Sequence, residues 1–198
     1  MDGLLIDWGG VLTTSVLAAF DAFSVRQGWP EHALRSAFRD GPARTHLVEL
    51  EEGTIELPEF ERRLATTLDL APEGLAQRLL ADVRPDTEMR AAVRRYHDAG
   101  IRTALVSNSW NADDYDAELR AMFDAVILSQ TLGTRKPARS IYECALDRLG
   151  LPAARCVFVD DLGGNLKPAK QLGMTTIKHE RTADTIRALD EVLLPGRS

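Results

Sequence analysis

The chain has 198 residues, which is the length of one domain or of one domain that carries a large insertion. Hydrophobic residues make up 44% of it and charged residues 27%, a composition that is typical of folded globular proteins and excludes a largely disordered chain. The net charge is −6, which has the wrong sign for a protein that binds nucleic acid or an anionic membrane. We therefore expect a small molecule as the partner, and neither nucleic acid nor membrane.

Two cysteines, Cys144 and Cys156, are too few for a disulfide framework and have no zinc-ligand spacing, so we expect ordinary thiols in a reducing compartment. No run of about 18 apolar residues is present, and no basic leader precedes the first apolar run. These features predict a cytoplasmic protein.

The first element in chain order is a short apolar run at residues 3–7. Gly9-Gly10 follow it closely, so the segment predicts a buried strand and then a turn. Residues 13–84 contain no strand-like run. Their helical spacing predicts an inserted helical subdomain with helices at 16–27, 31–38, 57–68 and 72–80.

Strands and helices alternate after Pro85. The predicted strands are residues 101–107, 125–129, 156–160 and 174–178, and the predicted helices are 87–99, 115–122, 140–149, 166–172 and 182–193. This alternation predicts a Rossmann-like, doubly wound parallel α/β sheet of about five strands with helices on both faces. Residues 1–12 and 85–198 would form this core, residues 13–84 an α-helical cap inserted after the first strand, and residues 195–198 a frayed end.

Polar residues follow several of the predicted strands at their carboxyl ends, which is where open parallel sheets bind ligands. They are Asp7, Ser107, Asn108, Lys136 and the pair Asp160-Asp161. Each has a simpler explanation when taken alone, such as a turn, a helix cap or a solvated loop. Two adjacent acids at a strand end are harder to explain in this way, because burying like charges is costly unless a cation offsets them.

Taken together, these residues favour phosphoryl chemistry. A carboxylate such as Asp7 can attack phosphorus when a divalent cation screens the repulsion between the two anions. Magnesium prefers oxygen ligands and needs few of them from the protein. The Ser107 hydroxyl can bind a phosphoryl oxygen, and Lys136 can neutralise developing charge.

The same segments resemble the four motifs of the haloacid dehalogenase-like hydrolase superfamily, over nearly the whole chain. They are similar above all to the branch that includes the N-terminal phosphatase domain of soluble epoxide hydrolase. The matching segments are Asp7-Trp8-Gly9-Gly10-Val11-Leu12, Leu105-Val106-Ser107-Asn108-Ser109-Trp110, Arg135-Lys136-Pro137 and the run from Phe158 to Ala169. The sequence Glu52-Gly53-Thr54-Ile55 before a helix also resembles the cap of that branch.

The resemblance implies a magnesium site. It makes Asp7 the nucleophile and a Mg²⁺ ligand, Asp161 the second carboxylate ligand, and Asp160 a supporting residue. Gly9 matches the position whose backbone carbonyl also ligates the metal.

The resemblance also implies a phosphoryl-binding set. Ser107 and Asn108 would hold the phosphoryl group, Lys136 would offset its charge, and Asn165 would steady the fourth loop. Ser107 and Lys136 thereby join Asp7 as the catalytic residues.

Gly9 departs from the family pattern, because phosphatases of this superfamily usually carry a second Asp there as general acid and base. Such a group is typically worth about 10²–10⁴-fold in rate. Dehalogenases of the superfamily also lack this acid, but they carry an aromatic residue in its place and a Ser-rich fourth motif, so Asp160-Asp161 argues against that activity.

Several residues of the insertion lie where the family's cap faces its substrate: Trp29, Phe38, Arg44 and His46. Core packing is the simpler expectation for the two aromatic residues. The acidic run from Glu49 to Glu52 predicts a solvated helix face.

The sequence thus predicts a magnesium-dependent phosphatase that acts on a small phosphomonoester through an aspartyl phosphate. Gly9 leaves two alternatives open. One is a catalytically weakened relative that binds a phosphorylated ligand or a protein, and the other is a different hydrolytic or group-transfer reaction that starts from Asp7. The sequence does not specify the substrate or the oligomeric state.

Overall fold

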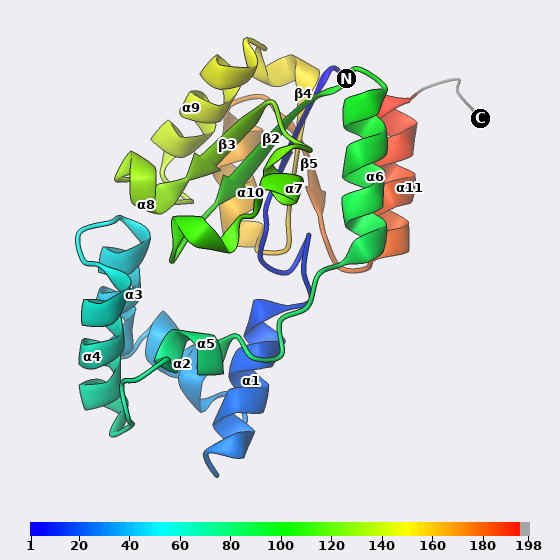
Figure 1. The fold of residues 1–198 in the computed structure, drawn as a ribbon. Helices are drawn as coiled ribbons and strands as arrows, with labels where there is room; N and C mark the ends of the chain where they lie inside the picture. The colour runs from blue at the N-terminus through cyan, green and yellow to red at the C-terminus, as the bar shows by residue number, and fades with distance from the viewer. Residues whose placement is uncertain (195–198) are drawn as a thin grey trace.

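The computed structural model describes residues 1–194 and contains a five-stranded, fully parallel sheet with the order β3-β2-β1-β4-β5 (Figure 1). The frayed end expected at residues 195–198 lies outside the described residues. The strands are β1 (Gly3–Ile6), β2 (Arg102–Ser107), β3 (Ala125–Leu128), β4 (Cys156–Asp160) and β5 (Thr175–Lys178). Strand β1 lies at the centre, and Leu5 pairs with Ala104 on one side and Phe158 on the other.

Helices cover both faces of the sheet, so the prediction of a doubly wound α/β fold is confirmed (Figure 1). Helices α6 (Thr87–Asp98) and α11 (Thr182–Leu193) pack in the hydrophobic cluster on one face. Helices α9 (Arg139–Leu149) and α10 (Gly163–Gln171) contribute to the cluster on the other. The middle residues of the central strands are apolar and buried because helices cover both faces of the sheet there.

Short elements complete this part of the chain: η1 (Ala112–Asp114), α7 (Ala117–Arg120), α8 (Ser129–Leu132) and η2 (Ala153–Arg155). The helix predicted at 115–122 is only one turn long. It begins after Asp116, whose side chain accepts a hydrogen bond from the Leu119 amide and caps the turn.

Five helices lie between β1 and α6 and pack around a hydrophobic cluster of their own. They are α1 (Val16–Arg26), α2 (Ala33–Arg39), α3 (Ala43–Glu51), α4 (Leu57–Leu68) and α5 (Leu75–Leu79), which we call the helical insertion. Figure 1 shows these helices, coloured blue to green, grouped beyond one edge of the sheet.

The side of the sheet on which successive strands are added changes at β1. Strands β2 and β3 are added on one side of it and β4 and β5 on the other, so the switch point lies at β1 and β4. Ligands of open α/β sheets bind outside the carboxyl ends of the strands at such a point. The fold therefore directs attention to Asp7 and Asp160.

Candidate active site

A buried lysine joins the carboxyl ends of the two central strands. The Lys136 ammonium lies 2.7 Å from an Asp7 carboxylate oxygen and 2.8 Å from an Asp160 oxygen. Only 1% of the lysine is exposed. Burial alone lowers the pKa of Lys136, but the charges of the two carboxylates outweigh burial and raise it. The ammonium therefore stays charged in the interior.

Asp160 is fully buried and its hydrogen-bonding capacity is well used. Besides the lysine, its carboxylate accepts hydrogen bonds from the Asn165 side-chain amide, 3.0 Å away, and from the Leu162 backbone amide, 2.8 Å away. The backbone carbonyl of Asn165 in turn accepts the Tyr142 hydroxyl at 2.7 Å. These contacts make Asp160 and Asn165 part of the framework that holds the lysine.

Asp161 completes a cluster of carboxylates. One oxygen from each of Asp7, Asp160 and Asp161 lies within 4.8 Å of the others. Three carboxylates face a single ammonium, so burial and mutual repulsion raise the pKa of Asp7 to about 8 and that of Asp161 to about 6. A divalent cation would offset this excess of negative charge, and the all-oxygen donor set fits Mg²⁺.

Asp7 and Asp161 are the carboxylates best placed to hold such an ion, because Asp160 is already occupied by the groups around it. Gly9 lines the same cavity as these two residues. The three residues predicted as metal ligands are therefore brought together.

The turn after β1 contains two glycines with different requirements. Gly10 has a φ of +80°, and a Cβ there would lie 2.6 Å from an Asp161 oxygen. Gly9 has no such left-handed backbone, and its nearest obstacle is a Val16 methyl group 3.1 Å from an ideal Cβ. Gly10 is thus required for the approach of Asp161, whereas Gly9 leaves limited room for a side chain.

Ser107 ends β2 with its hydroxyl 2.8 Å from the Tyr115 hydroxyl. Asn108 follows Ser107 and contacts the backbone of Lys136. Its side-chain oxygen accepts the Lys136 backbone N–H at 2.8 Å, and its amide donates to the Lys136 carbonyl at 3.1 Å. These two contacts make the Asn108 side chain hold the backbone of Lys136 in place, and they leave one of its two amide protons without a partner among residues 1–194.

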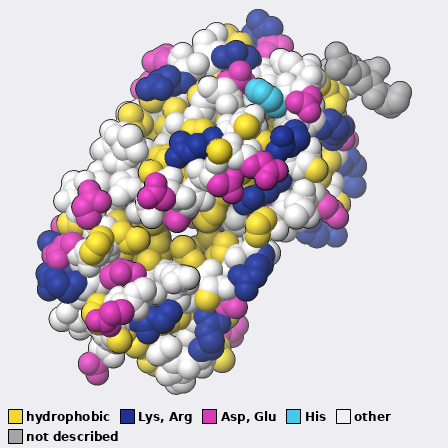
Figure 2. Space-filling model, in the orientation of Figure 1, with side chains coloured by type: hydrophobic (Ala, Val, Ile, Leu, Met, Phe, Trp, Pro, Cys, Tyr) yellow, Lys and Arg dark blue, Asp and Glu magenta, His cyan; other side chains and the backbone are white. Residues whose placement is uncertain are grey.

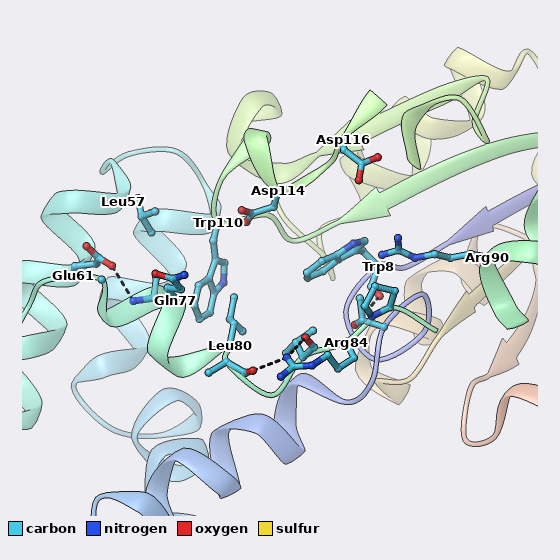
Figure 3. A pocket seen from close by; sticks show the side chains of 16 residues that line it. Trp8, Leu57, Glu61, Gln77, Leu80, Arg84, Arg90, Trp110, Asp114 and Asp116 are labelled. Carbon is cyan, nitrogen blue, oxygen red and sulfur yellow. Dashed lines mark hydrogen bonds between the residues drawn. The ribbon is translucent and has the colours of Figure 1, made fainter. Parts of the chain in front are cut away.

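A cavity of about 210 Å³ lies over these residues, between the sheet edge and the helical insertion. A cleft of about 810 Å³ adjoins it and shares four of its lining residues: Trp8, Leu80, Trp110 and Asp114. Figure 3 shows three of them, Trp8, Leu80 and Trp110, projecting into this cleft from different parts of the chain. Figure 2 shows hydrophobic side chains gathered in the hollow between the two parts of the molecule.

The acidic run predicted as a solvated helix face was wrong for one residue. Glu51, at the end of α3, is 6% exposed and lies 2.5 Å from the Arg135 guanidinium, beside Lys136. Burial raises its pKa against the influence of Arg135. Nothing in the local pattern of charges predicts this ion pair, because its partner lies far along the chain.

The aromatic residues of the insertion pack as core, as the simpler expectation had it. Phe38 is buried and Trp29 packs against the same cluster. A His46 ring nitrogen lies 3.2 Å from the Thr67 hydroxyl. Arg44 lines a third cavity, of about 610 Å³, which shares Leu17 and other lining residues with the cavity over Asp7.

The chain is similar to known proteins over most of its length. A model of the haloacid dehalogenase-like hydrolases matches residues 1–173. The chain belongs to this family. Bifunctional epoxide hydrolase 2 of Rattus norvegicus is 38% identical over 118 residues, which cover 55% of this chain and 21% of the rat protein. Acyl-CoA dehydrogenase family member 10 of Mus musculus is 28% identical over 201 residues, 96% of this chain and 19% of the mouse protein. The chain thus spans about a fifth of each of these relatives.

Solved structures of the family have the same fold. A predicted HAD-like family hydrolase of Porphyromonas gingivalis superposes with a TM-score of 0.77 at 21% identity, covering 98% of both chains. A HAD family enzyme of Bacteroides thetaiotaomicron, solved in complex with magnesium and inorganic phosphate, gives a TM-score of 0.69 at 19% identity, covering 91% of this chain and 94% of its own. Within residues 1–194, the helices lack the combination of length and apolar character needed to span a membrane.

Proposed function

We propose that this chain is a magnesium-dependent phosphatase that hydrolyses a small phosphomonoester through an aspartyl phosphate on Asp7. The observation that carries the proposal is the buried contact between Lys136 and Asp7, with Asp160 and Asp161 beside it. An ammonium at this place can neutralise an incoming phosphoryl group, and the carboxylates can hold the cation that the group requires.

The Asp7 carboxylate is fixed for attack. One of its oxygens lies 2.7 Å from the Lys136 ammonium and accepts a hydrogen bond from the Trp8 backbone amide, also at 2.7 Å. Attack of Asp7 on phosphorus forms the new P–O bond while the bond to the ester oxygen breaks. Water then hydrolyses the aspartyl phosphate, which releases inorganic phosphate and restores the carboxylate. A bound Mg²⁺ screens the repulsion between the two anions.

Gly9 determines which esters react well. No side chain at this position can protonate the leaving oxygen, so the rate depends on how readily that oxygen departs as an anion. We therefore propose aryl, acyl or anomeric phosphates as better substrates than simple alkyl phosphates.

The cavity favours a leaving group with an apolar face. The side chains of Val16, Leu17, Phe20, Leu47 and Trp110 line it opposite the charged residues. Apolar surfaces of this kind bind apolar groups by excluding water from both. A relative fits this inference: sesquiterpene phosphatase astK of Aspergillus oryzae is 29% identical over 135 residues, 64% of this chain and 68% of that protein.

Gly9 also supports a second candidate, a weakened relative that binds a phosphorylated ligand or a protein without turnover. The retained Lys136 and Asp161 favour the phosphatase, because ligand binding alone does not require a nucleophile with a metal site beside it. For either function we propose a cytoplasmic location, which is consistent with two free cysteines, Cys144 and Cys156.

A panel of phosphomonoesters assayed with Mg²⁺, and again with excess EDTA, tests the proposal. We expect Mg²⁺-dependent release of phosphate, fastest from aryl esters with an apolar ring. Binding of the same esters without release of phosphate would favour the second candidate, and neither binding nor release would contradict both.

A further inference from the structure

Tyr115 makes a contact that the expected catalytic set does not include. Its hydroxyl lies 2.8 Å from the Ser107 hydroxyl. Both residues are buried, with 4% and 2% exposed, and both line the catalytic cavity. Within residues 1–194, the Tyr115 hydroxyl has no hydrogen-bond partner other than Ser107.

The surrounding structure holds the phenol in this place. The ring packs edge-on against Trp8, the residue after Asp7, with centroids 5.5 Å apart and planes at 61°. Arg120 donates hydrogen bonds to the backbone carbonyls of Tyr115, at 2.7 Å, and of Ala112, at 2.9 Å. The loop after β2 is therefore anchored on both sides of the phenol, and Tyr115 has little freedom to leave Ser107.

The effect of this contact depends on which of the two hydroxyls donates its proton to the other. Each hydroxyl has one proton to donate. If Ser107 donates its proton to Tyr115, it has none for a phosphoryl oxygen. If Tyr115 donates to Ser107, the serine proton is free to point into the cavity, and accepting one hydrogen bond strengthens the serine as a donor. Burial raises the pKa of Tyr115 despite its contact with Ser107, so the phenol keeps its proton at neutral pH.

We propose that Tyr115 is a positioning residue, which donates a hydrogen bond to Ser107 and thereby directs the serine hydroxyl at the transferred phosphoryl group. This inference rests on the proposed function, because it assumes that Ser107 binds the phosphoryl group. Through this hydrogen bond, the loop after β2 would support the phosphoryl site. The motif residues alone do not supply that support.

Tyr115→Phe tests the inference, because it removes one oxygen and keeps the ring against Trp8. We expect kcat/KM for an aryl phosphate to fall about fivefold to twentyfold, which is the effect of one lost hydrogen bond at a charged group. The inhibition constant of inorganic phosphate in the presence of Mg²⁺ should rise in parallel. Tyr96→Phe is the matched control, since Tyr96 is a buried tyrosine whose hydroxyl binds Asp190, away from the cavity. It should lower the melting temperature and leave both constants unchanged.

A double-mutant cycle separates positioning from general packing. Ser107→Ala alone should lower kcat/KM, and adding Tyr115→Phe to it should cost little more, because the phenol then has no serine to direct. Equal losses from Tyr115→Phe in both backgrounds would overturn the inference, as would Tyr115→Phe kinetics identical to those of the native protein. If Tyr115→Phe proves too unstable to assay, the Ser107→Ala protein still decides: native affinity for inorganic phosphate would overturn the proposed contact. A native protein that neither hydrolyses aryl phosphates nor binds phosphate would instead overturn the proposed function itself.

Discussion

Lys136 illustrates how a single residue can hold a site together. It separates two carboxylates at the ends of adjacent strands, and its own charge is tolerated in the interior only because both carboxylates contact it. Asn108 fixes its backbone from the neighbouring loop. The three groups therefore form one unit, in which the loss of any member removes a contact that the others depend on.

Lys136→Met should consequently lower the free energy of unfolding by about 3–5 kcal/mol, the usual cost of leaving a buried charge without its partner. It should also abolish turnover. Urea denaturation measures the first effect and a phosphate-release assay the second. Lys178→Met is the matched control: that lysine is about half exposed and pairs with the exposed Glu180, so we expect little change in stability. Equal stability of the two variants would contradict this description of the site.

Gly9→Asp should raise turnover of alkyl phosphates more than that of aryl phosphates, because an acid helps most when the leaving oxygen is strongly basic. The backbone at Gly9 is not left-handed, and the Val16 methyl group needs to shift by only a few tenths of an ångström. Rates across a series of leaving groups measure the gain. If the folded variant showed the same ratio of alkyl to aryl rates as the native protein, the general-acid explanation of Gly9 would be wrong.

Gly10→Ala should lower activity, in contrast to Gly9→Asp. Its left-handed backbone disfavours alanine, and the new methyl group would meet the Asp161 carboxylate. We expect weaker Mg²⁺ binding and lower activity, both measurable by titration of Mg²⁺ in the aryl phosphate assay. Unchanged Mg²⁺ dependence would argue against Asp161 as a ligand.

The carboxylates also predict how Mg²⁺ binding depends on pH. In the ion-free protein the pKa of Asp7 is raised to about 8 and that of Asp161 to about 6, so the folded state retains protons that the unfolded state loses. Ion-free stability therefore declines as pH rises from about 4 toward 8. Because Mg²⁺ must displace these protons, its stabilising effect should be greater at pH 8 than at pH 5.5. Melting temperatures with Mg²⁺ and with EDTA measure this difference, and equal shifts at both pH values would contradict it.

At the scale of elements, the end of α3 is the feature that brings the helical insertion close to the sheet. Glu51 pairs with Arg135 there, and two residues later Gly53 turns the chain with a φ of +68°. A Cβ on Gly53 would lie 2.3 Å from the Gln130 carbonyl oxygen, so only glycine permits this approach.

Gly53→Ala should therefore destabilise the protein by more than the strain of a left-handed alanine, which is about 1 kcal/mol. It should also raise KM, because the insertion must move away from the cavity. Gly28→Ala is the matched control. Gly28 has a φ of +73°, but nothing lies within 4 Å of an added Cβ, so we expect the strain alone and an unchanged KM. Urea denaturation and aryl phosphate kinetics compare the two, and similar KM values would contradict a role for this contact in shaping the site.

The longer elements could be predicted from the sequence because each has a strong pattern of its own. The five strands and helices such as α4 and α11 lie within a few residues of the predicted bounds, although β5 is only partly buried. Helix α8 was not predicted because it is a single turn, and α3 was anticipated only as the helix face at residues 49–52. Glu51 was misjudged for a different reason: its burial depends on Arg135, and pairing over such a separation leaves no local signal.

At the scale of the whole molecule, the sheet and the helical insertion are joined by two chain crossings that lie side by side. Thr13 pairs with Pro85, the Thr14 amide donates to the Arg84 carbonyl at 2.8 Å, and the Asp86 amide donates to Leu12 at 2.9 Å. The contact of α3 with Arg135 lies at the wall of the cavity, because Glu51 and Arg135 both line it. Residues of the helical insertion, such as Leu17, Phe20 and Leu47, thus line the same cavity as Asp7.

The same topology explains which part of the site could be predicted. Residues at strand ends, such as Asp7, Ser107 and Asp160, could be assigned to one edge because parallel strands bring their carboxyl ends together. Tyr115 could not, because its loop returns to Ser107 through tertiary packing. Nor could the contact of the Asn108 side chain with the Lys136 backbone, because that contact depends on geometry that residue order does not specify.

Trapping the phosphorylated enzyme tests the central claim most directly. The native protein is mixed with Mg²⁺ and an aryl phosphate, quenched with acid during the first turnover, and analysed by peptide mass spectrometry, with Asp7→Asn treated in the same way. We expect a phosphoryl group on Asp7 in the native protein, and neither phosphorylation nor hydrolysis in the folded variant. Undiminished turnover by folded Asp7→Asn protein would contradict the proposed role of Asp7 as the nucleophile.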